Sequence, residues 1–309
     1  MRRIRPDRPP RQPRGMTLIE MVVAMVVVAI ILSATIFFAY PVRQAADATS
    51  RAELTDIADN ALQRIGRDVR LALPNSVRVT TSGSSTFIEF LAVRAAGRYR
   101  ADAGGVSSGT DCPVDGGPAA PAADQLSFDV AETCFKTIGT EPSAANIVAN
   151  SDFLVLNNYG AIVLPSVLFP GQNAYQAAPA NRVLITGLVV EATRLRISFG
   201  STVFQRSLHD SSGKRFYVIS GPVTYECNTA TQQVIRYSGY AITAAQPTAF
   251  GVGARIADYV TGCAMDYDPN GVAPQVGVLT LRLVLSRTMS GGAAETVSLY
   301  HAVHVSNLP

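Results

Sequence analysis

The chain has 309 residues with 26 basic and 23 acidic side chains, and its formal net charge is +3 at neutral pH. The first fifteen residues carry six of the basic side chains and one of the acidic ones, so residues 16–309 hold 20 basic and 22 acidic side chains. The basic balance therefore belongs to the N-terminus. The net positive charge therefore does not indicate that the protein binds nucleic acid.

An uncharged apolar run follows this N-terminus, from Met21 to Tyr40. As a helix its roughly 20 residues would be about 30 Å long, which is enough to span a bilayer. Glu20 stands at the head of the run, where a carboxylate is costly unless a positive charge pairs with it. The preceding arginines predict that the N-terminus is cytoplasmic and that the rest of the chain lies across the membrane.

The segment Arg14-Gly15-Met16-Thr17-Leu18-Ile19-Glu20 resembles the processing motif of type IV prepilins and of type II secretion pseudopilins. This resemblance implies that residues 1–15 are a leader, cleaved after Gly15 by prepilin peptidase, and that the new N-terminus at Met16 is N-methylated. It also implies that Glu20 acts in assembly, where the amine of Met16 can neutralise it. Met16 departs from the commoner Phe, and the leader is long and rich in Pro.

An ordinary secretory signal is the alternative reading of the same run. Small residues follow it, and signal-peptidase cleavage near Ala46 or Asp47 would be compatible with them. That reading leaves Gly15 and Glu20 unexplained, so we favour the prepilin interpretation. The favoured location is then the bacterial inner membrane in a single pass, with a periplasmic C-terminal domain, and later a pilus or pseudopilus.

Helical periodicity continues beyond the apolar run. Apolar residues recur at helical spacing from Leu54 to Val69, and the pattern stops at Leu73 because Pro74 follows. The sequence predicts an N-terminal helix within residues 16–73, with a transmembrane segment at about 21–40 and an amphipathic second part. The plainer alternative, that the second part is a core helix of a globular domain, also requires its apolar stripe to pack on a sheet.

After Pro74 the pattern changes to the alternation typical of strands. A long helix followed by many strands predicts an α+β fold, in which an antiparallel sheet from a β-rich domain at residues 74–309 packs on the second part of the helix. Three segments, 97–123, 141–151 and 170–180, are predicted loops. The predicted strands are Val77–Thr81, Thr86–Val93, Gln125–Val130, Phe153–Asn157, Arg182–Val189, Thr193–Phe199, Arg215–Ser220, Val223–Cys227, Gln233–Tyr237, Ala264–Tyr267, Gly277–Ser286 and Glu295–Val305.

The four cysteines show no C-x-x-C spacing, which does not favour a zinc site or a redox dithiol. In an oxidising periplasm disulfides are expected, and four cysteines allow three pairings. We prefer the local pairing of Cys112 with Cys134 and of Cys227 with Cys263. Each disulfide would close a short loop and stabilise the domain by about 3 kcal/mol.

Two short motifs suggest chemistry, and neither is well supported. Gly105-Val106-Ser107-Ser108-Gly109 matches the G-x-S-x-G pattern of hydrolases, but its flanks read as loop, so no helix follows the serine. Asp266, Asp268 and Asn270 copy the first half of a calcium loop, although Gly277 stands where a bidentate Glu is needed. A hairpin turn at residues 268–271 is the preferred interpretation, and calcium is the weaker one.

The three histidines give no metal site by spacing. His301 and His304 lie three apart on a predicted strand and should point to opposite faces. His209 is expected in a turn. We therefore expect no cofactor, no metal and no enzymatic activity.

Segments in the C-terminal third narrow the resemblance. Residues 218–227, 279–283 and 297–307, with the helical segment 51–56, are similar to minor pilins of the MSHA pilus system, relatives of the J-type minor pseudopilins of type II secretion. The implied partners are prepilin peptidase, other major and minor pilins and an assembly platform in the inner membrane. The alternatives are a secretion pseudopilin or a membrane-tethered periplasmic adhesin or enzyme.

Overall fold

The computed structural model describes residues 15–101, 112, 125–128, 131–160, 172–176, 181–191, 194–204, 213–273, 276–289 and 292–308. The chain divides into two compact units, Met1–Ala52 and Glu53–Pro309. The division falls inside helix α1 (Leu18–Arg70), so the second part of this helix belongs to the same unit as the strands. All of the expected leader except Gly15 lies outside the described residues.

The first unit contains the N-terminal part of α1. Leu18–Phe37 is a stretch of 20 residues with a mean hydropathy of 2.6, and none of it is buried by the rest of the chain. Its length and composition suit a membrane span, although a signal sequence meets the same two conditions. The helix expected within residues 16–73 is thus present, and it ends three residues before Leu73.

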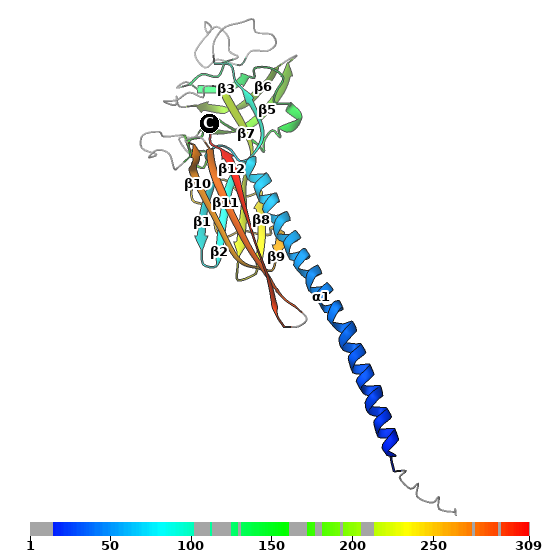
Figure 1. Ribbon diagram of the computed structural model, residues 1–309. Coiled ribbons are helices and arrows are strands. Elements are labelled where there is room, and N and C mark those ends of the chain that lie inside the picture. The colour runs from blue at the N-terminus through cyan, green and yellow to red at the C-terminus, as the bar shows by residue number, and fades with distance from the viewer. Residues whose placement is uncertain are drawn as a thin grey trace, which may run out of the picture. The chain divides into compact units, whose positions relative to one another are not determined.

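The second unit joins the rest of α1 to two antiparallel sheets, which confirms the predicted α+β fold (Figure 1). Among the described residues, the larger sheet has the order β1-β2-β7-β4-β5-β6-β3, with β8 between β7 and β9, and the smaller has the order β10-β11-β12. The larger sheet contains β1 (Arg78–Ser82), β2 (Ser85–Arg98), β3 (Ala131–Lys136), β4 (Phe153–Val155), β5 (Arg182–Glu191), β6 (Arg194–Val203), β7 (Arg215–Asn228), β8 (Gln233–Ser238) and β9 (Ala254–Asp258). The smaller contains β10 (Val260–Ala273), β11 (Val276–Thr288) and β12 (Ala294–Ser306), and a short 3-10 helix, η1 (Ala144–Asn146), precedes β4.

Several details of the strand prediction were wrong. The sequence predicted one sheet, and the structure has two. The strands expected at 215–220 and 223–227 are one strand, β7, which passes through Gly221 at a φ of 124° in a register irregularity opposite β2. Residues 125–128 of the strand expected at 125–130 are not a strand, and the strand lies at β3 instead.

Strand β3 was missed because its sequence contains Lys136, which reads as a solvent-exposed residue. In the structure Lys136 is fully buried, and its Nζ lies 2.9 Å from a carboxylate oxygen of Glu191. Strand β9 was missed for a different reason, because it is short and its first two residues are exposed. Local sequence does not reveal a buried ion pair, since the partner lies on a distant strand.

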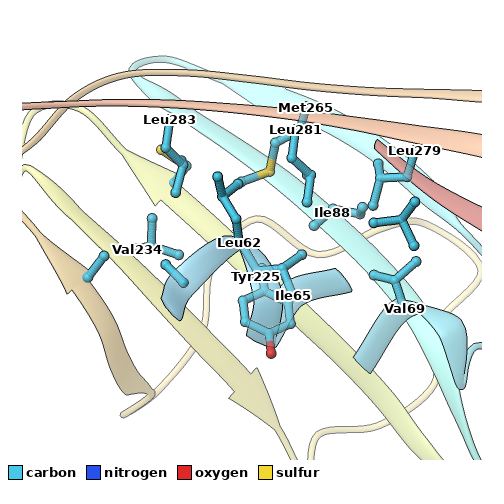
Figure 2. Packing of buried hydrophobic residues seen from close by; sticks show 14 of the residues in the cluster. Leu62, Ile65, Val69, Ile88, Tyr225, Val234, Met265, Leu279, Leu281 and Leu283 are labelled. Atoms are coloured by element: carbon cyan, nitrogen blue, oxygen red, sulfur yellow. The ribbon is translucent and has the colours of Figure 1, made fainter. Parts of the chain in front are cut away.

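The core is built around the apolar stripe of α1. Leu54, Leu62, Ile65 and Val69 are at most 2% exposed, as their helical spacing predicted. They form one cluster with side chains from both sheets, so the helix shares its core with each of them. Figure 2 shows part of this cluster, with Leu62, Ile65, Val69, Ile88, Tyr225, Val234, Met265, Leu279, Leu281 and Leu283 labelled. Each such side chain contributes about 1.5–3 kcal/mol when it is fully buried.

Two disulfides lie in the second unit. Cys227 on β7 pairs with Cys263 on β10, so this bond links the larger sheet to the smaller one. Cys112 pairs with Cys134 on β3. The Cα atoms are 5.6 Å apart in the Cys112–Cys134 pair and 6.6 Å apart in the Cys227–Cys263 pair. The structure therefore contains the two local pairs that the sequence analysis preferred.

A polar contact holds the last turns of α1 to the larger sheet. Asp68 accepts hydrogen bonds at one carboxylate oxygen from the hydroxyl of Tyr225, at 2.7 Å, and from Nε of Arg236, at 2.9 Å. Burial and the neighbouring Asp68 carboxylate raise the pKa of Tyr225 well above its ordinary value, so the phenol remains a neutral donor. The contact fixes which face of the helix meets β7 and β8.

We expect Tyr225→Phe to lower stability without changing the fold. The substitution removes one hydrogen bond to a charged acceptor, worth about 1.5–3 kcal/mol, and retains the buried ring. For a domain of this size that loss corresponds to roughly 2–4 °C of Tm per kcal/mol. Thermal unfolding of the purified chain measures it. Tyr300→Phe is the matched control, because Tyr300 is 65% exposed. Equal Tm values for the two variants would contradict the assigned contact.

Candidate functional site

The candidate site is the segment in which α1 begins. Gly15, Met16 and Thr17 are not helical, and the helix starts at Leu18. The Thr17 carbonyl accepts hydrogen bonds from the backbone N–H groups of Glu20, at 3.1 Å, and Met21, at 3.2 Å. The Thr17 hydroxyl oxygen also accepts from the Glu20 N–H at 3.4 Å. Thr17 is therefore the N-cap of the helix.

Thr17 and Glu20 have the spacing of a capping box, T-x-x-E. In that motif the side chain at the cap accepts from the third helical N–H, and the acid reaches back toward the N–H of the cap. A carboxylate in the first turn is also favoured by the positive end of the helix dipole. Within the described residues only the Thr17 half of this motif is formed, since no backbone N–H donates to the Glu20 carboxylate. Sequence reasoning missed the T-x-x-E spacing, although it was visible next to the apolar run.

The two residues of the predicted cleavage site are accessible. Met16 is 64% exposed, and a Cβ added to Gly15 would meet no other atom within 4 Å. Over the part of the chain that the structure describes, no cation pairs with Glu20. The segment therefore presents a glycine followed by a free helix start, the form in which an enzyme can reach the peptide bond.

The other candidate residues are scattered. The G-x-S-x-G segment at 105–109 and His209 lie outside the described residues. His301 is half-buried, and its ring lies beside Gly66 of α1. A Cβ added to Gly66 would be 2.9 Å from Nε2 of His301. His304 is exposed on the other face of β12, so the two histidines do point in opposite directions.

The expected hairpin turn at 268–271 was wrong. Strand β10 continues to Ala273, and the register with β11 becomes irregular between Asp268 and Ala273. Asp268 accepts a hydrogen bond from the backbone N–H of Asn270 at 2.9 Å, and Asp266 lies one alternation earlier on the strand. Within the described residues, no group of three or more His, Cys, Asp or Glu side chains could hold a metal ion.

The long loop between β8 and β9 contains a pocket of about 560 Å³. The pocket has no charged residue in its lining, which consists of the end of β8 and residues up to Val252. The Tyr237 ring stacks on Phe250 with centroids 4.5 Å apart, and its hydroxyl donates to Glu226 at 2.8 Å. Burial, and that carboxylate, raise the pKa of Tyr237 to about 12. Nothing in the sequence analysis singled out this loop.

Residues 10–36 match the family model described as the prokaryotic N-terminal methylation motif, which includes Gly15, Met16 and Glu20. This match supports a type IV prepilin-like protein, either a pilin or a pseudopilin, and implies processing by a prepilin peptidase and assembly with other pilins. Together with the apolar helix, it supports anchoring in a membrane. No curated protein and no solved structure matches the chain.

We expect Gly15→Val to leave an uncut precursor. The added side chain meets nothing in the structure, so folding should be unchanged, whereas a β-branched residue restricts the backbone that the peptidase must accommodate. N-terminal sequencing of membrane-extracted protein measures the outcome, with Met16 as the expected wild-type start. Gly200→Val, at another glycine with open space around it, should be cleaved normally. A mature start near Ala46 or Asp47 would refute the prepilin interpretation.

Proposed function

We propose that this chain is a structural subunit of a type IV pilus-like filament and not an enzyme. The observation that carries the proposal is the start of α1, where accessible Gly15 and Met16 precede a helix with Glu20 in its first turn and an apolar segment beyond it. The match to the methylation motif over the same residues supports it. Its finer form is a minor pilin of the MSHA type, and the alternative is a minor pseudopilin of type II secretion.

The topology follows from the charges. The six arginines of the leader hold the N-terminus in the cytoplasm, the apolar segment crosses the inner membrane, and the β domain lies in the periplasm. Disulfides suit that compartment. Cleavage after Gly15 removes the leader and frees the amine of Met16, which is then methylated. The assembly platform inserts the processed subunit into a filament or into the complex that initiates one.

Glu20 then has two separable tasks. In a bundle of apolar helices an unpaired carboxylate or ammonium group is costly, so Glu20 and the amine of Met16, on a neighbouring subunit or on the same chain, neutralise each other. A pair across subunits fixes the axial position of one subunit against the next. The second task we propose is to complete the capping box that Thr17 begins, which requires hydrogen-bonding groups but no charge.

Glu20→Gln and Glu20→Ala distinguish these tasks. Gln retains the capping box and loses the charge, whereas Ala loses both. We expect both variants to be cleaved, to enter the membrane and to form the native disulfides. Incorporation into sheared filaments, quantified by immunoblot against the total pool, should fall sharply and equally in both.

Two results would change the account of Glu20. If Glu20→Gln assembled as well as wild type while Glu20→Ala did not, capping would be the task that matters. If both assembled normally, charge pairing would be wrong for this subunit. Thr17→Ser is the matched control, since Ser is also an efficient N-cap. Mass spectrometry of sheared pili and of secretion pseudopili decides between the two kinds of filament.

Ligand binding by the β domain is a second candidate function, favoured by the pocket in the β8–β9 loop. Its volume of about 560 Å³ lies within the range of small-ligand sites. Because its lining is uncharged, a charged ligand would lose hydration without gaining an ion pair. The pocket therefore suits an uncharged surface ligand such as a neutral saccharide, which would make this subunit an adhesin within the filament.

Gly251→Asp tests this candidate. The added Cβ has open space, and the carboxylate would place a charge in the uncharged pocket. We expect the full chain in detergent to bind neutral saccharides on a glycan array, and Gly251→Asp to weaken binding about tenfold or more, the effect of roughly 1.4 kcal/mol. Gly200→Asp is the matched control. Retention of charged glycans only, or equal binding by all three proteins, would contradict it.

A further inference from the structure

The solvent-exposed side of α1 in the second unit separates its charges into two blocks. The acids come first along the helix and the arginines follow, and all six side chains are exposed. We call these groups the acidic block and the basic block. The acidic block is Glu53, Asp56 and Asp59, and the basic block is Arg64, Arg67 and Arg70.

The residues of the two blocks have the same spacing along the helix. Within each block the residues are three apart, and each acid has an arginine 11 residues later, as in Asp56 and Arg67. Eleven residues complete three turns of an α-helix to within about 20°, so both blocks lie on one side of the helix. They are displaced along its axis by about 16 Å.

This segregation is unfavourable for an isolated helix. Residues three apart are neighbours on the helix surface, and like charges at that spacing repel each other. Alternating signs at the same positions would attract. Of the six side chains, only Glu53 has an ion pair with any residue that the structure describes, to Arg287 at 2.9 Å. Arg67 and Arg70 gain from the negative end of the helix dipole, but the acidic block lies far from the N-terminus and gains nothing comparable.

A second copy of this chain satisfies the pattern. We propose that two copies pack with these segments of α1 parallel and shifted by 11 residues, so that the acidic block of one copy faces the basic block of the next. This inference rests on the proposed function, because chains anchored at the same end in one membrane run in the same direction. Each copy keeps one block free, so the contact is heterologous and propagates as an open array, as a filament requires.

The contact depends on the membrane or filament for its strength. Each surface ion pair is weak by itself and is screened by salt, so it is effective only when the copies are held close together. The charges act as a register device, since the 11-residue shift pairs all three acids with arginines, whereas parallel shifts of 8 or 14 residues pair only two and an unshifted pair brings acids beside acids. An antiparallel pair would also match the blocks, without any displacement, which makes it the alternative arrangement that a test must distinguish.

Cross-linking in membranes tests the register. Ala52 and Gln63 are both exposed, lie on the charged side and are 11 residues apart. Two tagged forms of the full chain are co-expressed, one with Ala52→Cys and the other with Gln63→Cys, and treated with a short thiol-to-thiol reagent. The native cysteines are paired, so they do not react. We expect a cross-linked product that carries both tags.

A charge exchange tests the cause. The Ala52→Cys form is given two further substitutions, Asp56→Arg and Asp59→Arg. We expect the yield of the cross-linked product to fall about tenfold, because two attractive pairs become repulsive. Arg67→Glu with Arg70→Glu on the Gln63→Cys form should do the same. The two altered forms together should restore the product, because the signs are then exchanged. Glu53 is left unchanged to preserve its contact with Arg287, and Arg282→Glu on the exposed face of β11 is the control.

Several outcomes would overturn the proposal. A product from Asn60→Cys with Gln63→Cys in place of the expected one would indicate the antiparallel pair. Failure of the combined forms to restore the product would remove the charges as its cause. Products only with other proteins would assign the blocks to a different pilin. In each case N-terminal sequencing at Met16 and membrane retention show separately whether the proposed function still holds, since neither depends on the register.

Discussion

The apolar stripe of α1 is the contact on which the second unit depends. Leu54, Leu62, Ile65 and Val69 join a cluster that includes side chains from both sheets. Neither sheet is closed on itself, and each has an inner face that needs an apolar partner. One helix covers both, and Gly66 allows it to lie close to His301 of β12, since an added Cβ there would be 2.9 Å from the ring. Loss of the stripe would leave two exposed apolar faces.

Polar contacts set the position of the helix end relative to the strands. Asp68 is held by donors from β7 and β8. Beyond Arg70 the chain turns at Asn75, which has a φ of 59°, and its side-chain amide donates to the carbonyls of Asn158 and Asn307. The C-terminal residues are thereby tied to the end of the helix. These contacts give the apolar packing a unique geometry, since hydrophobic burial alone is non-directional.

The two sides of the helix therefore differ in how their charges are satisfied. On the inner side, Asp68 has two donors at short distance. On the outer side, five of the six charged residues that define the blocks have no ion pair within the described chain. A filament subunit needs this division, because its inner face must hold one fold while its outer face stays available for neighbours. The first turn of α1 follows the same division, with the Glu20 side chain exposed and its backbone N–H bonded to Thr17.

Much of the fold was predictable from local patterns. Helical periodicity located α1 to within a few residues, and alternation found most strands, including β11 and β12. The prediction failed where partners are distant in sequence. Strand β3 was not predicted because its Lys136 reads as an exposed residue. The carboxylate of Glu191, which pairs with Lys136 in the buried site, lies far along the chain. The turn expected at 268–271 was wrong because Asn270 lies in an irregular extension of β10. Pairing with β11 determines this extension, and the local turn residues do not.

The sequence by itself determined the features that depend on composition and short spacing. These are the apolar span and the basic residues before it, the Gly15–Glu20 motif and the amphipathic helix, because each is encoded within a few turns, whereas the pairing of the cysteines was a preference among three that the structure confirmed. Tertiary structure alone decided that the strands divide into two sheets which share one apolar cluster with the helix, and that the β8–β9 loop lines an uncharged pocket. The physical reason is that sheet pairing and loop packing join residues far apart in the chain, whose contact energies no local pattern contains.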